Sequence, residues 1–136
     1  MKNIIITIGL CCCTALTYAQ EIRDASNGIK GYINPDGSVQ DQSSNTIGHF
    51  NQDGSVWDNH GKKLGYINGL EIQDATHKTI SYLQKDGTVE NGEHTPLGYL
   101  HYSGTGQVTD QLHHIVGNIT KVEPMWAAAY FFCFKF

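Results

Sequence analysis

From residue 21 onward, apolar and polar positions alternate in short stretches separated by polar, glycine-containing turns. Successive stretches are alike: residues 31–41 read GYINPDGSVQD and residues 48–58 read GHFNQDGSVWD. Further copies start at residues 65, 81 and 98, so the spacings are 17, 17, 16 and 17 residues. Alternation with a period of two favours strands, and a repeat of this length indicates one supersecondary unit written several times. The pattern predicts an all-β domain over residues 20–120.

Each unit predicts a β-hairpin with a bulged turn. In the first unit, Pro35 and Asp36 suit the centre of a type I turn, and Gly37 suits the left-handed position that follows. This three-residue loop would place one apolar cross-strand pair per unit on the same face of the sheet. The predicted pairs are Ile33 with Val39, Phe50 with Val56, and Leu83 with Val89.

Two units depart from this turn. The third is one residue shorter, and its Asn68 and Gly69 predict a two-residue loop that pairs Ile67 with Leu70. The fifth, around residues 103–106, carries a longer loop that contains two glycines.

Partial copies at both ends of the repeat favour a closed ring. Residues 21–24 match the second half of a unit, and residues 117–119 match a first half. Short hairpins need a shared core, which an open stack or a ring could supply. Pairing of the half-units would close the ring and remove exposed strand edges. Recurring glycines are expected on the inward face, where backbones approach closely: Gly31, Gly48, Gly65 and Gly98.

Residues 121–136 are expected to plug this ring as part of the same domain. Pro124 suits the first turn of a helix, and the alanines at 127–129 favour one. Because the segment is apolar on nearly all sides, it has to be surrounded. We expect it at the centre, with Phe131, Phe132 and Phe134 filling the middle. An unburied tail would instead join copies of the chain into a homo-oligomer.

Residues 1–19 predict a cleavable signal peptide. Lys2 precedes an apolar core that is too short to span a membrane, and Ala19 is a small residue before the expected cut. We therefore expect a periplasmic or secreted protein that begins at Gln20. A lipid anchor on one of the cysteines at 11–13 is disfavoured, because Gly9 and Leu10 poorly match the usual preceding residues. No transmembrane segment is expected after cleavage, since the C-terminal segment is shorter than about 20 apolar residues.

The repeat and the C-terminal segment resemble the five-fold β-flower family of small exported proteins, found mainly in Bacteroidota. The G-Y-I…D-G-x-V-x-D units over residues 21–120 and the Ala/Phe-rich end at 127–136 carry the resemblance. It implies a pseudo-five-fold ring of short antiparallel hairpins around the C-terminal segment. It implies no activity, because the family is defined by its fold. The short third unit and Ser81 in place of glycine depart from strict regularity.

Charge and motifs exclude several classes of function. The net charge of −4 is spread without a basic stripe, so nucleic acid is not expected as a partner. No nucleophile elbow, phosphate loop or zinc-protease motif occurs, and no cofactor is expected. Cys133 lies among phenylalanines, where a thiol is usually an inert packing residue. A non-enzymatic protein is therefore expected; a hydrolytic enzyme with an unrecognised site is the alternative.

Histidines and turn aspartates suggest metal sites that we do not expect to form. His77, His94 and His113 each lie four residues before a unit, so in a ring three imidazoles could face one metal. Other units carry Asn, Ser or Gly there, which favours solvated loop histidines. Asp36 and Asp53 faintly resemble calcium ligands, but their loops lack the first acid and the final glutamate.

Trp57 is the remaining candidate for ligand binding. It stands where the other units carry Gln, Glu or Thr, on the face opposite the apolar pairs. Such an aromatic could stack on a sugar or anchor a protein, or simply pack against His49 across the hairpin. The sequence thus predicts a non-enzymatic envelope module with a protein or glycan partner that it does not identify. Carbohydrate binding through Trp57 is the alternative.

Overall fold

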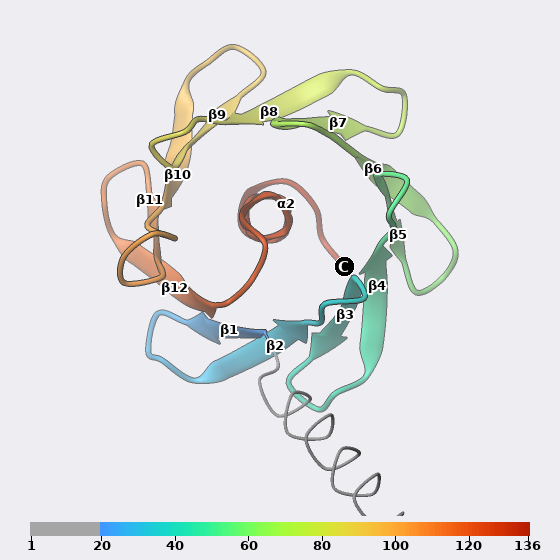
Figure 1. Ribbon diagram of the computed structural model, residues 1–136, viewed down its shortest axis with the longest axis horizontal. Coiled ribbons are helices and arrows are strands. Elements are labelled where there is room, and N and C mark those ends of the chain that lie inside the picture. Colours follow the sequence, from blue (N-terminus) through green and yellow to red (C-terminus); the bar gives the residue numbers. More distant parts are fainter. Residues whose placement is uncertain (1–19) are drawn as a thin grey trace, which may run out of the picture.

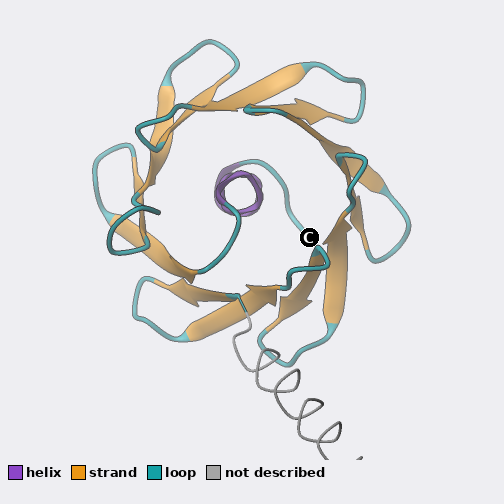
Figure 2. Ribbon diagram, viewed as in Figure 1, coloured by secondary structure: helices purple, strands orange, loops and turns teal. Residues whose placement is uncertain are grey.

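The computed structural model describes residues 20–136 as one closed ring of strands with a helix inside it (Figure 1). Figure 2 shows the strands in orange around the purple helix. The predicted signal peptide lies outside the described residues. The strands are β1 (Glu21–Asp24), β2 (Ile29–Ile33), β3 (Ser38–Asp41), β4 (Thr46–Phe50), β5 (Ser55–Asp58), β6 (Lys63–Asn68), β7 (Glu71–Asp74), β8 (Thr79–Leu83), β9 (Thr88–Asn91), β10 (Pro96–Leu100), β11 (Gln107–Asp110) and β12 (Ile115–Thr120), followed by α2 (Pro124–Phe132).

The two half-units close the ring, as the sequence predicts. Strand β1 pairs antiparallel with β12, and Ile22 lies opposite Ile119. Strand β1 also pairs with β2, so all twelve strands have two hydrogen-bonded neighbours. The five predicted hairpins are present, and the β12–β1 pair adds a sixth two-stranded unit. Closure leaves no strand edge in the described part of the chain to template aggregation.

Hairpin registers follow the predicted turn chemistry in the regular units. Ile33 lies opposite Val39, Phe50 opposite Val56, and Leu83 opposite Val89. The glycines that follow the type I turns have φ angles of 93° to 96°, a conformation that strains residues with a Cβ.

The predicted register of the third hairpin is wrong. Ile67 lies opposite Ile72 rather than Leu70, and the two-residue turn is formed by Gly69 and Leu70. Leu70 is exposed, whereas Ile72 is fully buried. This register buries the stronger apolar pair and places Asp74 opposite Gly65, the position that Asp58 takes opposite Gly48. Aligning the units on their aspartates would have found it.

The two ends of the ring are built differently. The hairpin turns lie at one end, which we call the turn end. The loops at residues 25–28, 42–45, 59–62, 75–78, 92–95 and 111–114 lie at the other, the loop end, and splay outward (Figure 1). Each of these loops follows an Asp or Asn whose side chain accepts two backbone N–H bonds. Asp58, for example, accepts from His60 and Lys62 at 2.9 Å each. Such bonds hold the loop in a turn without a sheet partner.

A β-bulge precedes the inward-facing small residue of every unit. The register shifts there in all six loop-connected strand pairs, so one residue has no partner across the ladder. A bulge changes the direction in which the side chain of its extra residue points. In five of the six bulges this side chain is apolar and packs on the core: Ile47, Leu64, Ile80, Leu97 and Val116. The sixth is Lys30.

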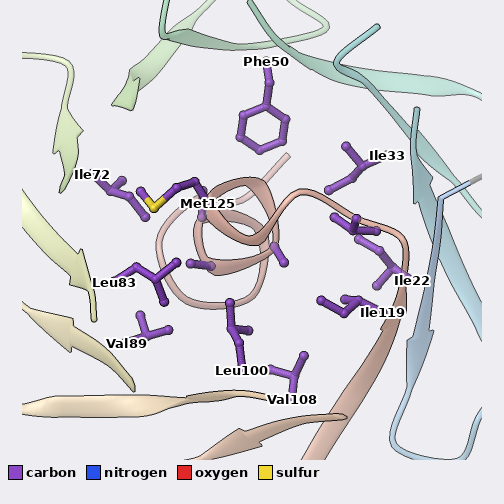
Figure 3. Close-up of a cluster of buried hydrophobic side chains, with 14 of the residues drawn as sticks. Ile22, Ile33, Phe50, Ile72, Leu83, Val89, Leu100, Val108, Ile119 and Met125 are labelled. Carbon is purple, nitrogen blue, oxygen red and sulfur yellow. The ribbon is translucent and has the colours of Figure 1, made fainter. Parts of the chain in front are cut away.

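Helix α2 fills the ring from the turn end to the loop end. Glu123 caps it by accepting the N–H of Met125 at 2.8 Å, and Pro124 occupies its first position. Strand side chains such as Ile72, Leu100 and Val108 point at it from all sides (Figure 3). Three helix alanines are fully buried: Ala127, Ala128 and Ala129. Among the described residues, no helix is long and apolar enough to cross a membrane.

The phenylalanines do not fill the middle of the ring; they are half-buried nearer its loop end. The helix alanines are fully buried among the strand side chains. The aromatic rings instead lie over the inward glycines. A Cβ on Gly48 would meet Phe136 at 2.2 Å, on Gly65 Phe134 at 2.7 Å, on Gly98 Phe132 at 2.5 Å and on Gly117 Phe131 at 2.6 Å.

The fourth unit carries a matched pair of exceptions. Ser81 replaces the inward glycine, and its hydroxyl donates to the backbone oxygen of Glu90 at 2.7 Å. The residue of the C-terminal segment that contacts it is Cys133, which also hydrogen-bonds with Ser81. Ser81, which is larger than the glycine of the other units, therefore faces Cys133, the smallest of the C-terminal side chains that contact these inward positions.

Candidate functional site

A large cavity opens at the turn end, beside the start of α2. Its volume is about 680 Å³, which is within the range of small-molecule sites. A smaller cavity of about 330 Å³ lies on the other side of the same segment, and both are lined by Glu123 and Trp126. The centre of the turn end is thus hollowed around one indole ring.

Apart from Pro35 in the turn of the first hairpin, the walls of this turn-end cavity come from segments that break the repeat. They are the residue before β1, the long turn after β10, and the connection from β12 to the helix. The long turn closes on His101, whose backbone oxygen accepts the N–H of Gly104 at 3.1 Å and of Gly106 at 2.9 Å. Because these segments have no counterpart in the other hairpins, the turn end of the ring is asymmetric at this cavity.

Two aromatic side chains line the cavity. Trp126 is half-buried and stacks on Phe50, with ring centroids 5.3 Å apart and an interplanar angle of 12°. Its indole N–H makes no hydrogen bond to any described residue. Tyr102 is 38% exposed and is held by a 3.1 Å bond from its hydroxyl to the backbone oxygen of Lys85. Both rings are therefore positioned by neighbours and still border open space.

Few polar side chains line the cavity, and the two that are charged have opposite signs. The side-chain oxygen of Gln20 is buried and has no hydrogen-bond donor among the described residues. Such a buried acceptor needs a partner, which a ligand or a water could supply. Glu123 and Lys121 are the ionisable side chains in the lining, and Glu123 is already engaged as the helix cap.

This arrangement suits binding better than acid–base chemistry. General acid and base pairs need two groups of different proton affinity around one substrate atom. The lining has a single carboxylate, Glu123, and its side chain already accepts the N–H of Met125 as the helix cap.

The pKa values that do shift belong to the turns and loops. Backbone N–H groups lower the pKa of Asp41 and Asp58, and the Ser38 backbone and hydroxyl lower that of Asp36. The hydroxyl of Ser55 does the same to the pKa of Asp53. These aspartates serve the turns, which agrees with the interpretation that they are not calcium ligands.

Trp57 lies on the outer face of the ring, away from both turn-end cavities. It stands opposite His49, as the sequence suggests, and is half-buried. Its indole N–H donates to the hydroxyl of Ser55 at 3.0 Å, and the ammonium of Lys63 lies 5.0 Å from its ring centroid. Lys63 also donates to the hydroxyl of Tyr66 at 2.7 Å. Trp57 is therefore part of a packed surface strip, with its polar atom and one neighbouring cation already paired.

The three candidate histidines are not brought together. Each has a positive φ in its own loop and stacks on the tyrosine of its own unit. The centroid distances are 3.9 Å for His77 on Tyr66, 4.4 Å for His94 on Tyr82 and 4.6 Å for His113 on Tyr99. Among residues 20–136, no cluster of three or more His, Cys, Asp or Glu side chains could hold a metal ion.

Cys133 is half-buried against the ring, and burial raises the pKa of its thiol to about 11. Reactive thiols have a lowered pKa, so this one is suited to packing.

Sequence analysis missed Trp126, Tyr102 and Gln20. The signal that could have found them is position outside the repeat: repeated residues are explained by the hairpin, and unique ones are not. Which unique residues meet depends on where the helix enters the ring.

Comparison with curated proteins finds no significant match, and comparison with solved structures finds none either. One family model matches residues 19–135, which include the hairpin ring and nearly all of the C-terminal segment. The match agrees with the closed ring of hairpins and the helix at its centre. The chain belongs to the 5-fold beta-flower protein family.

Proposed function

We propose that the protein is an exported, non-enzymatic module that binds a neutral carbohydrate in the turn-end cavity. The observation that carries the proposal is that the indole of Trp126 and the buried side-chain oxygen of Gln20, which has no hydrogen-bond donor among the described residues, line the same turn-end cavity. Export rests on the predicted signal peptide of residues 1–19.

A sugar matches this combination of groups. Pyranose rings present C–H faces that pack on aromatic side chains, and hydroxyls that satisfy isolated acceptors. Trp126 and Tyr102 offer aromatic surface, and Gln20 offers the acceptor. Glu123 and Lys121 carry opposite charges, so the lining favours a neutral ligand over an anion or a cation.

Support for binding rather than hydrolysis comes from the single carboxylate in the lining. Glycoside hydrolysis normally uses two carboxyl groups on either side of the scissile bond. We therefore expect no turnover on glycoside, ester or peptide substrate panels. Turnover that disappears in Glu123→Gln would favour the hydrolase alternative.

The test is a glycan array followed by calorimetry of the best ligand with the full mature chain. Trp126→Phe keeps a ring on Phe50 but removes the indole N–H, and Tyr102→Ala removes an exposed ring. We expect each to weaken binding up to about tenfold, because Tyr102→Ala removes an aromatic contact and Trp126→Phe removes a hydrogen-bond donor, and each contributes roughly 0.5–1.5 kcal/mol. Trp57→Ala is the matched control on the outer face and should bind like wild type.

Two outcomes would overturn this assignment. If neutral glycans do not bind wild type, carbohydrate binding is removed altogether. If Trp57→Ala abolishes binding while Tyr102→Ala does not, the site is the outer strip of Trp57, Lys63 and Tyr66.

A further inference from the structure

A second cavity lies at the opposite end of the ring, where the C-terminal residues emerge beside the bulges. Its volume is about 400 Å³, and seven consecutive residues, 130–136, form most of its lining together with Lys30 and Ile47. It shares no lining residue with the turn-end cavities. This loop-end cavity is therefore a separate feature from the proposed carbohydrate site.

The walls of the loop-end cavity are aromatic and only half-buried. Tyr130 packs edge-on against Phe131, with centroids 5.4 Å apart, and lies 6.1 Å from the ring of Phe136. One side of these rings covers the inward glycines, and the other borders the cavity. Aromatic surface of this kind favours an apolar ligand.

The charged side chains that line this cavity have one sign. Lys30 and Lys135 line it, and no aspartate or glutamate side chain does. Neither lysine forms an ion pair with a described residue. The ammonium of Lys30 instead lies 5.5 Å from the ring centroids of both Tyr130 and Phe131. The chain as a whole has a net charge of −4, so this cationic rim is a local exception.

Lys30 is also the exception within the repeat. It occupies the bulge position at which the other five units place an apolar side chain on the core. The five apolar equivalents are partly buried on the core, whereas Lys30 is exposed, so packing on the core does not account for the lysine. The position of Lys30 beside the cavity accounts for a lysine at this bulge, because its ammonium lies against the aromatic walls, where an anion can reach it.

We propose that the loop-end cavity binds a single amphipathic carboxylate, such as a medium-chain fatty acid. The alkyl chain would lie on Phe131, Phe132 and Phe134, and the carboxylate would pair with Lys30 and Lys135. Both lysines are exposed and can reach a carboxylate at the mouth of the cavity, where a charge-assisted hydrogen bond is stronger than a neutral one.

An extended anionic membrane surface fits this end less well. Aspartates begin five of the six loops around it, and hydrogen bonds from the loop backbone lower the pKa of Asp41, Asp58 and Asp110. They remain charged at neutral pH and would repel a sheet of anionic headgroups. A small acid can enter between them and reach the lysines.

The test compares three eight-carbon probes by calorimetry with the wild-type mature chain: octanoate, 1-octanol and octylamine. We expect octanoate to bind at least tenfold more tightly than octylamine, with 1-octanol between them. Decanoate should bind more tightly than octanoate, by roughly threefold to fourfold for each added CH₂. Equal affinity for octanoate and octylamine, or no binding of octanoate, would overturn the proposal without any variant.

Variants then locate the site. The double variant Lys30→Gln, Lys135→Gln should bind octanoate about tenfold more weakly and 1-octanol as before. Lys62→Gln, which removes an exposed lysine from a loop at the same end, is the matched control and should leave octanoate binding unchanged. Equal losses in the double variant and the control would mean non-specific attraction and refute the site. Octanoate binding should survive Tyr102→Ala, so failure of one proposal is distinguishable from failure of the other.

Discussion

Replacing Gly98 with alanine tests whether the C-terminal aromatic rings are wedged against the ring of strands. A Cβ at this position would lie 2.3 Å from the backbone oxygen of Thr109 and 2.5 Å from a ring atom of Phe132. Carbon contacts are favourable at about 3.5–4.0 Å, so strand β11 and the phenylalanine would both have to move by roughly 1 Å. Overpacking of a core costs about 1–3 kcal/mol. With two obstacles, one of them backbone, we expect a loss of about 3 kcal/mol.

Gly104→Ala is the matched control for this substitution. Its Cβ would meet only the backbone oxygen of His101, at 4.0 Å, so its stability should stay within about 0.5 kcal/mol of wild type. Urea unfolding followed by tryptophan fluorescence measures both free energies. For a domain of this size, Gly98→Ala should also lower Tm by roughly 10 °C. If the two variants unfold at the same urea concentration, the rings are not wedged and the reasoning fails.

Three further predictions concern the fourth unit, its thiol and the loop aspartates. Cys133→Phe should destabilise the fold, because the larger ring would meet the Cβ of Ser81, where other units have glycine. Adding Ser81→Gly should recover at least about 1 kcal/mol of the free energy of unfolding, measured as a double-mutant cycle by urea unfolding. Additive effects of the two substitutions would contradict a matched pair. With a pKa of about 11, the Cys133 thiol should react slowly with iodoacetamide near pH 8 until urea unfolds the chain; equal rates in both states would disprove its burial. Backbone N–H groups lower the pKa of Asp58 from its usual 3.8. The ionised side chain therefore stabilises the folded chain above pH 3.8, and this stabilisation is lost as the pH falls through the lowered pKa. Tm should therefore drop below about pH 3.8, and Asp58→Asn should weaken that drop, since Asn91 already makes the same two bonds; an unchanged acid profile would show that other groups dominate.

Most of the hairpin architecture was predictable because it depends on neighbours in the sequence. The glycine after Asp36 accepts a positive φ, so the turn sets the register that pairs Ile33 with Val39. The third unit shows the limit of this logic. Asn68 and Gly69 are good turn residues, but burial of Ile72 and the loop bonds of Asp74 decide the register instead.

The bulges were not predicted, although they leave a trace in the sequence. In five of the six units an apolar residue directly before the inward small residue breaks strict alternation, as in Ile47-Gly48 and Leu97-Gly98. Strict alternation alone would place one residue of each such adjacent pair on the solvent face of the strand. The bulge turns the first side chain back toward the core, whose other members are distant in sequence.

The sequence by itself determined the repeat, the turns and the closure of the ring, because these follow from local turn chemistry and from matching half-units at residues 21–24 and 117–119. Only the tertiary structure decided which residues gather at the two ends. Trp126 meets Tyr102 and Gln20 because of where the helix enters the ring. Lys30 meets the C-terminal rings because of where the chain leaves the helix. Both cavities form where non-repeating segments pack against a repeating wall, and no local pattern in the chain encodes that contact.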